Sequence, residues 1–321
     1  MNITVLFEDL DLLVIDKPAG VTVNKAETTR NEITIQDWAE KKLKIDPDQP
    51  RLDRGQIGDV DSDFYKRGGL PATHSSANKQ NIQERDSYKF SDPVKDFALR
   101  AGVVHRLDKE TSGVLLLAKN PSAFSNLQKQ FKERTVKKVY NALAHGRITP
   151  SIGEINVPVG RLPWNRNRFG ILPGGRESET QYKVLGYYLY SRNNQDISSS
   201  SERSESRSNN EAIQQFNNSE VSRRARTIKD EEILTLVELY PQSGRTHQIR
   251  VHLKYIGHPI FSDFLYAGRK TARADRKFLP RVFLHASKIS FTHPSTAKEL
   301  TFDVPLPSTL SSLLDSLTKV S

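Results

Sequence analysis

Residues 104–119 of the chain read Val104-His-Arg-Leu-Asp-Lys-Glu-Thr-Ser-Gly-Val-Leu-Leu-Leu-Ala-Lys119. The first half of this stretch is polar and charged, whereas Val114-Leu-Leu-Leu-Ala118 is an unbroken apolar run. An apolar run of this length after a polar segment is typical of a loop that leads into a buried strand. We therefore expect Asp108 to lie at the wall of a cleft and not on a freely solvated surface.

The composition favours a folded protein with a polyanionic partner. Of the 321 residues, 36% are hydrophobic, which is enough for a sizeable core. The chain has 48 basic and 38 acidic residues, and its net charge of +10 favours a partner that carries phosphates. It contains no cysteine, which excludes disulfides, thiolate catalysis and cysteine-type zinc sites.

The first residues do not resemble a targeting or membrane segment. Glu8, Asp9, Asp11 and Asp16 interrupt the apolar residues there, unlike in a secretory signal or an acid-poor transit peptide. No apolar run approaches the roughly twenty residues of a membrane span. We therefore expect a soluble, cytoplasmic protein without a membrane partner. No sequence feature implies a protein partner, and we expect a monomer.

Hydrophobic periodicity predicts many strands and a few amphipathic helices. Asn120 before Pro121 marks a helix start, because asparagine caps helices and proline fits the first helical position. Gly257 and Pro259 mark a helix end. The predicted strands cover residues 3–7, 11–17, 114–118, 136–146, 180–190, 233–240, 282–291 and 299–304, and the predicted helices cover 33–43, 121–133 and 246–256.

Two polar segments, residues 46–97 and 191–230, interrupt this pattern. They are rich in charged, amide and serine residues and offer too little apolar surface to offset the entropy cost of ordering. We interpret them as mobile insertions. No internal repeat is present, so residues 1–321 are expected to form one domain that the insertions interrupt.

A second informative stretch reads Leu239-Tyr-Pro-Gln-Ser-Gly-Arg-Thr-His-Gln-Ile-Arg-Val-His-Leu253. It is expected to run from a strand through a turn into a helix. On that helix, Ile249 and Leu253 follow the spacing of a core-facing stripe, whereas Arg250 and Lys254 share a different, polar face.

Two histidines of this stretch, His247 and His252, raise the question of a metal site. Their five-residue spacing places them about 140° apart on a helix, and no acidic partner completes a zinc motif. We therefore expect no metal.

These stretches, together with Lys137-Lys-Val-Tyr-Asn-Ala-Leu143 and Asp16-Lys-Pro-Ala-Gly20, resemble the motifs of RluA-type pseudouridine synthases. That family converts uridine in structured RNA to its C-glycoside isomer. The resemblance is densest from His105 to Ala118. It implies an α/β (α+β) fold, with a mixed, mostly antiparallel sheet, flanking helices and a central catalytic cleft, and it implies no cofactor.

The resemblance makes Asp108 the catalytic residue. Uracil must leave C1′, rotate and rejoin through C5. An ionised carboxylate could attack C1′ to form a covalent adduct, or abstract a sugar proton to form a glycal, and both routes stay open. By the resemblance, Arg250 pairs with Asp108, and Tyr140 stacks on the target base and acts on the C5 proton. In the Asp16 to Gly20 motif, the lysine and the proline support the core under the catalytic loop.

The resemblance also implies residues that bind RNA. Arg106 would take the place of the flipped-out uridine, and Ile249 would shape the uracil pocket. Arg245, His105 and Thr111 are further candidates for the RNA site, with His105 more suited to ordering the loop than to acting as a general base. Basic segments at 129–138, 161–168 and 269–281 could follow the RNA backbone.

The expected RNA is rRNA or tRNA. Many family members carry an N-terminal S4-type RNA-binding domain, and the catalytic pattern here begins almost at residue 1, which leaves tRNA open. A catalytically silent RNA-binding or ribosome-assembly protein on the same fold is the main alternative. A glycosidase or nucleoside hydrolase acting through Asp108 lacks an obvious second carboxylate. Structural alternatives are a surface ion pair for Asp108, core packing for Tyr140 and a solvated cation for Arg250.

Overall fold

The computed structural model describes residues 1, 3–26, 29, 31–45, 93–165, 168–191 and 231–320. The segments that we interpreted as insertions lie outside these residues, apart from 93–97 and residue 191.

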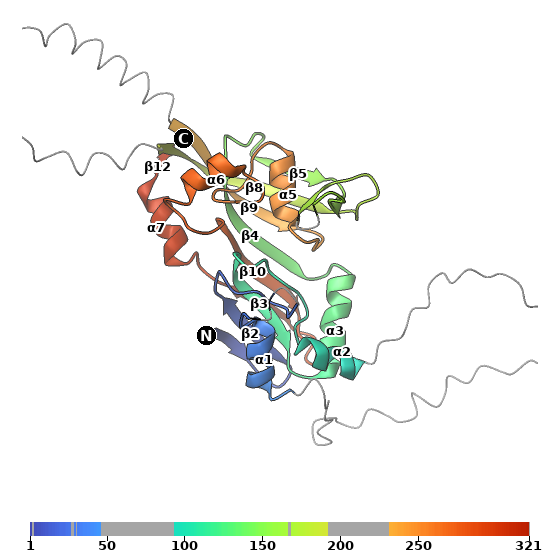
Figure 1. Ribbon diagram of the computed structural model, residues 1–321. Helices are drawn as coiled ribbons and strands as arrows, with labels where there is room; N and C mark the ends of the chain where they lie inside the picture. The colour runs from blue at the N-terminus through green and yellow to red at the C-terminus, as the bar shows by residue number, and fades with distance from the viewer. Residues whose placement is uncertain are drawn as a thin grey trace, which may run out of the picture.

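One long sheet of ten described strands runs through the molecule (Figure 1). Its strands are antiparallel except for β3 and β10, which run parallel. The predicted mixed, mostly antiparallel sheet is therefore confirmed. The order along the sheet is β1 (Thr4–Glu8), β2 (Leu12–Lys17), β3 (Ser112–Ala118), β10 (Leu284–Thr292), β4 (Lys137–His145), β9 (Glu231–Pro241), β8 (Glu179–Ser191) and β12 (Thr318–Val320), with β11 (Glu299–Asp303) beside β10 and β5 (Ile152–Asn156) beside β8.

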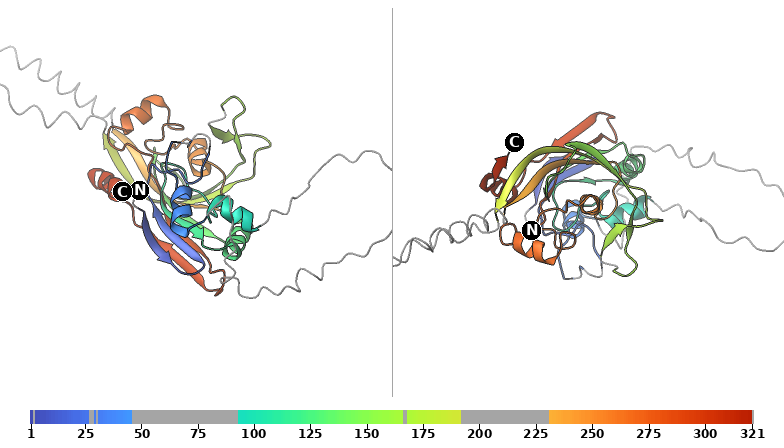
Figure 2. Two further views of the ribbon diagram at one scale, coloured as in Figure 1. Left: turned by 60° about the horizontal axis from the view of Figure 1, so that its bottom comes forward. Right: turned by 90° about the horizontal axis from the view of Figure 1, so that it is seen from above.

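The helices gather at the two ends of this sheet, which twists along its length (Figures 1 and 2). Figure 1 shows α1 (Ile35–Leu43), α2 (Pro93–Arg100) and α3 (Pro121–Lys132) toward one end, and α5 (Gln248–Tyr255), α6 (Arg269–Asp275) and α7 (Ser308–Ser316) toward the other. Strands β6 (Val159–Arg161) and β7 (Phe169–Ile171) form a separate two-stranded hairpin.

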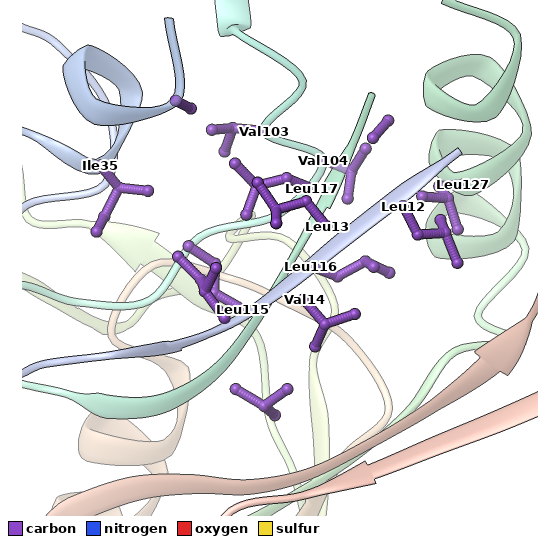
Figure 3. Packing of buried hydrophobic residues seen from close by; sticks show 14 of the residues in the cluster. Leu12, Leu13, Val14, Ile35, Val103, Val104, Leu115, Leu116, Leu117 and Leu127 are labelled. Carbon is purple, nitrogen blue, oxygen red and sulfur yellow. The ribbon is translucent and has the colours of Figure 1, made fainter. Parts of the chain in front are cut away.

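Most of the core lies in two hydrophobic clusters that meet near the middle of the sheet, and a third, small cluster contains Val159, Val251 and Tyr266. The first cluster gathers around β2 and β3, where all seven residues of β3 are buried (Figure 3). The second gathers around β4, β9 and α5. Tyr140 of β4 packs against both clusters, so the junction lies beside this residue.

Two of the predicted boundaries are wrong. Helix α2 begins at Pro93, within the range in which we expected a mobile insertion, because the buried Phe97 packs edge-on against Phe124 at 6.0 Å. Helix α5 begins at Gln248 and not at residue 246, because His247 adopts a left-handed conformation with φ 58°.

Gly113 of β3 pairs with Ala286 of β10 at close approach. Its φ is +116°, and a Cβ placed there would lie 2.1 Å from the carbonyl oxygen of Ala286. We expect Gly113→Ala to lower the free energy of unfolding by about 1–3 kcal/mol, because β3 must shift away from β10. Gly244→Ala is the control, since its Cβ would meet only Lys138 Nζ at 4.0 Å. Equal urea midpoints for the two variants would show that β3 does not approach β10 this closely at residue 113.

His145 at the end of β4 links two acidic residues. Its Nε2 lies 2.9 Å from Asp275 Oδ2, and its Nδ1 lies 2.9 Å from Glu232 Oε1. Burial acts to lower the pKa of His145, but these hydrogen bonds outweigh it and raise the pKa from 6.5 to about 9. The native state therefore binds this proton more tightly than the unfolded state does.

The stability that this proton contributes is fully present below about pH 6.5 and is lost as the pH rises through about 9. We expect wild type to lose on the order of 2–3 kcal/mol of unfolding free energy over this window relative to His145→Gln. Urea denaturation of both proteins at pH 6.5 and pH 9.5 measures the difference. Parallel pH profiles would show that His145 is not the titrating group.

Candidate active site

A cleft of about 360 Å³ opens at the junction of the two core clusters. Its walls come from the loop 104–111, from β4 with the residues just before it, and from the segment 241–250 that leads from β9 into α5. All the site residues that the sequence pointed to line this cleft, and most of them carry ionisable side chains. They are His105, Arg106, Asp108, Thr111, Tyr140, Arg245, Ile249 and Arg250.

A buried lysine supports the loop that carries Asp108. Lys17, at the end of β2, has no exposed surface, and its Nζ donates to the carbonyl oxygens of Pro18, Lys109 and Thr111 at 2.9, 3.3 and 2.8 Å. Burial, assisted by repulsion from Arg281, lowers the pKa of Lys17 to about 7. The motif from Asp16 to Gly20 therefore lies beneath the loop, as the resemblance implied.

We expect Lys17→Met to leave these three carbonyl groups without their donor. The cost should be about 1–3 kcal/mol in the free energy of unfolding, and any activity of the cleft should fall with it. Urea denaturation measures the first effect. Lys41→Met, on the exposed side of α1, is the matched control and should unfold like wild type. Indistinguishable midpoints for the two variants would mean that Lys17 does not hold the loop.

Asp108 is paired with Arg250 as expected. Arg250 Nη1 donates to Asp108 Oδ2 at 3.1 Å, and the side chain of Asp108 is 20% exposed, so one face of the carboxylate remains open to the cleft. A second carboxylate holds the guanidinium. Arg250 Nε and Nη2 donate to the two oxygens of Asp263 at 2.7 and 2.9 Å.

Arg250 and Lys254 share one side of α5 by their spacing, but they differ in exposure. Arg250 is buried, whereas Lys254 is exposed. The bidentate hydrogen bond to Asp263 replaces the hydrogen bonds to water that the guanidinium loses on burial. Burial acts to lower the pKa of Arg250, but Asp263 and then Asp108 raise it above its ordinary value. The cation is therefore permanent and fixed in direction.

The sequence interpretation missed Asp263. This residue is fully buried and also accepts the backbone N–H groups of Leu265 and Tyr266 at 3.0 and 3.2 Å. A signal was present, since Ser262 and Asp263 interrupt the apolar residues between Ile260 and Tyr266, and only Asp263 is charged. A carboxylate inside such a stretch requires a buried partner.

Tyr140 reaches the cleft from β4. Burial, and then the charge of Asp108, raise the pKa of its phenol above the ordinary value. The phenol is therefore neutral at physiological pH. It can stack on a ring and donate a hydrogen bond, but a free phenolate is disfavoured beside the carboxylate.

His105 fastens the loop to the neighbouring strand. Its Nε2 accepts the backbone N–H of Leu116 at 2.9 Å, and its ring stacks on Phe131 with 4.9 Å between centroids. Burial, and then the charge of Lys138, lower the pKa of His105 to about 3. The ring is therefore neutral, and this geometry suits ordering of the loop.

The other four candidates take different places along the cleft. Arg106 is exposed, and no described residue forms a hydrogen bond or ion pair with its side chain. Ile249 and Thr111 are buried in the wall, and Arg245 is held by a bond from its Nε to the carbonyl oxygen of Glu177 at 3.2 Å. The cleft thus combines an apolar wall with cations at its rim.

The basic segment 269–281 is partly structural. Arg276 binds both oxygens of Glu110 at 3.0 and 2.7 Å, and Arg281 Nη2 donates to Ser112 Oγ at 2.9 Å. These two guanidiniums fix the Asp108 loop and the start of β3 from behind, so they are not free to follow an RNA backbone.

The described part of the chain contains no group of three or more histidine or acidic side chains arranged to hold a metal ion. His247 and His252 have separate partners, Tyr266 and Thr180 respectively. None of the described helices has the length and apolar character that crossing a membrane requires.

Residues 63–255 match the model of a protein family described as RNA pseudouridylate synthase. The chain is 34% identical over 221 residues to the uncharacterized RNA pseudouridine synthase YlyB of Bacillus subtilis, covering 69% of this chain and 57% of that protein. It is 33% identical to the ribosomal large subunit pseudouridine synthase D of Neisseria meningitidis, covering 68% of this chain and 48% of that protein. The chain spans about half the length of the curated relatives it matches.

The fold has a solved counterpart. The structure of human RNA Pseudouridylate Synthase Domain Containing 1 superposes with a TM-score of 0.58 at 22% identity, covering 100% of this chain and 89% of that chain. At this identity the likeness concerns the fold.

Proposed function

Because the chain belongs to the RNA pseudouridylate synthase family, we propose that it isomerises uridine to pseudouridine in RNA, with Asp108 as its catalytic carboxylate. One observation carries the proposal beyond family membership. Asp108 projects into the cleft with one oxygen held by Arg250 and with part of its surface open, while Asp263 fixes the arginine from behind. A charged, oriented and accessible carboxylate is what both routes at the sugar require.

Each route uses the same contacts. In the first, an Asp108 oxygen bonds to C1′ as the C1′–N1 bond breaks, and C5 of the rotated base then bonds to C1′ as the bond from Asp108 to C1′ breaks. In the second, Asp108 takes a sugar proton as the base leaves a glycal, and it returns that proton to the sugar when C5 bonds to C1′. In both, the RNA loses the C5 proton to solvent and gains a proton from solvent on N1, so its composition is unchanged. Arg250 donates to one oxygen of Asp108 and so orients the carboxylate.

The neutral Tyr140 phenol suits stacking on the uracil ring while the ring rotates. Because the pKa of the phenol is raised, Tyr140 keeps its hydroxyl proton. It can therefore accept the C5 proton only if it gives up that hydroxyl proton in the same step. Ile249 supplies an apolar wall for the ring, and Arg106, free of partners among the described residues, suits the place of the flipped-out nucleotide.

The proposed substrate is rRNA or tRNA. Some relatives are named ribosomal large subunit pseudouridine synthases, which favours testing rRNA first. The net charge of +10 and the cations at the cleft rim support binding through phosphates. We further propose a monomer that acts in the cytoplasm as one catalytic domain.

Tritium release from RNA labelled at uridine C5 tests the proposal. The RNA is taken from cells that lack the gene, and the rRNA and tRNA fractions are incubated separately with the protein. We expect release from one fraction, because C5 exchanges its proton only when the glycosidic bond moves there. A catalytically silent RNA-binding protein would bind a fraction and release none.

A further inference from the structure

His247 is a second ionisable side chain beside Asp108, and the reaction as described above gives it no role. Its Nε2 lies 3.9 Å from Asp108 Oδ2, the same oxygen that Arg250 binds. The side chain of His247 is only 16% exposed. This distance is longer than a hydrogen bond, but donors around catalytic groups often lie too far in free enzymes and close in when substrate binds.

A hydrogen-bonded tyrosine determines which nitrogen of His247 carries the proton. His247 Nδ1 lies 2.8 Å from the hydroxyl of Tyr266, and that hydroxyl accepts the backbone N–H of Phe169 at 3.1 Å. The hydroxyl proton has no other acceptor among the described residues, so it is assigned to Nδ1. The remaining proton of a neutral imidazole then lies on Nε2, the nitrogen nearest Asp108.

The ring is also fixed by packing. It makes edge contacts with Phe169 and Tyr266, with centroids 5.5 and 5.6 Å away. Its backbone is left-handed at φ 58°, and its side chain makes no capping bond to α5. Such strain in a residue other than glycine persists where the surroundings impose it, and functional sites are a common place for it.

Burial lowers the pKa of His247, against the attraction of Asp108. Arg250 and Arg106 also disfavour the charged ring, while Asp263 favours it. A neutral ring offers a donor without adding a second full cation beside the carboxylate. That matters because Asp108 must stay reactive, and a second cation would further stabilise its unreacted form.

We propose that His247 is a positioning residue, which donates its Nε2–H to Asp108 when RNA is bound and so sets the direction of the carboxylate together with Arg250. No proton is transferred in this role. Tyr266 is a positioning residue one step further away, since it fixes the tautomer of His247. The inference rests on the proposed isomerase function.

Four variants test the proposal with C5-labelled RNA under steady-state conditions. His247→Phe keeps a ring against Phe169 but removes the donor, and we expect kcat to fall about ten- to hundredfold with KM within about twofold. His247→Gln keeps an N–H donor and should recover a large part of kcat. Tyr266→Phe should lower kcat less than His247→Phe does. His258→Phe, just beyond the far end of α5, removes an imidazole that binds the carbonyl oxygen of His145 and does not line the cleft, so it should leave kcat unchanged.

An unchanged kcat in His247→Phe, a change confined to KM, or no recovery by His247→Gln would each overturn the proposal. Thermal unfolding of each variant separates misfolding from loss of the donor. Nitrogen-15 NMR of the wild-type histidines gives a readout that does not depend on activity. The proposal requires a neutral Nε2–H tautomer for His247, and an Nδ1–H tautomer or an imidazolium at pH 7 would overturn it.

These measurements distinguish failure of the proposed isomerase function from failure of the proposed role of His247. If wild type released no tritium from any RNA, the isomerase function would fail, and the NMR result would still decide the state of His247. If wild type were active and His247→Phe equally so, only the role of His247 would fall.

Discussion

Asp108→Asn is expected to lower the rate of C5 tritium release at least about a thousandfold. The amide keeps the size and polarity of the side chain but can neither attack C1′ nor take a sugar proton. The fold should survive, because Arg250 keeps its bidentate bond to Asp263 and because Asp108 is partly exposed. Initial rates, thermal unfolding and RNA binding by filter retention measure the three properties.

Two further variants sharpen this result. Asp108→Glu retains the charge but moves the oxygens by one methylene, and a misplacement of about 1 Å is expected to cost about a hundredfold. Asp315→Asn makes the same chemical change on the exposed side of α7 and should leave the rate unchanged. Substantial release by Asp108→Asn would mean that another group carries the reaction.

Asp263→Asn is expected to destabilise the protein more than Gly113→Ala or Lys17→Met does. The side chain is fully buried, and its negative charge compensates a guanidinium that is itself buried. Asp263→Asn leaves the buried guanidinium with its single bond to the partly exposed Asp108 as its remaining ion pair among the described residues, and breaking a buried pair in this way costs about 3–5 kcal/mol. Urea denaturation at constant pH gives the free energy of unfolding directly.

Asp303→Asn is the matched control, because Asp303 makes an exposed ion pair with Lys288 at 3.0 Å. Surface pairs of this kind contribute about 0–1 kcal/mol. We also expect Asp263→Asn to impair tritium release, since Arg250 would lose the carboxylate that directs it toward Asp108. A loss of stability no greater than that of the control would show that the buried pair is not what holds Arg250.

Strong local signals made much of the fold predictable. The apolar run of β3 is buried at every position, and the cap at Asn120 accepts the backbone N–H of Ala123 at 2.8 Å. The elements missed by the sequence are short or polar. Strands β6 and β7 have three residues each, and β7 is held by the contact of Phe169 with His247, which lies 78 residues later in the chain.

Site residues were predictable where each lies within a sequence motif. Asp108, Tyr140 and Arg250 each lie in a recognisable stretch, and the structure brings all three to one cleft. Asp263 gave a signal in the sequence, but its pairing with Arg250 and the contact between His247 and Asp108 were not predictable, because both depend on how the segments before and after α5 pack in three dimensions. No periodicity in the sequence specifies this packing.

A product balance tests the central claim most directly. An RNA with a single C5-tritiated target uridine is incubated with wild-type protein, and tritium release, pseudouridine and free uracil are measured in the same sample. A carboxylate that guides uracil from N1 to C5 predicts one tritium released for each pseudouridine formed, an RNA of unchanged mass apart from that exchange, and no free uracil. Free uracil with an abasic ribose would instead reveal a hydrolase, and RNA binding without release would leave Asp108 with no catalytic role.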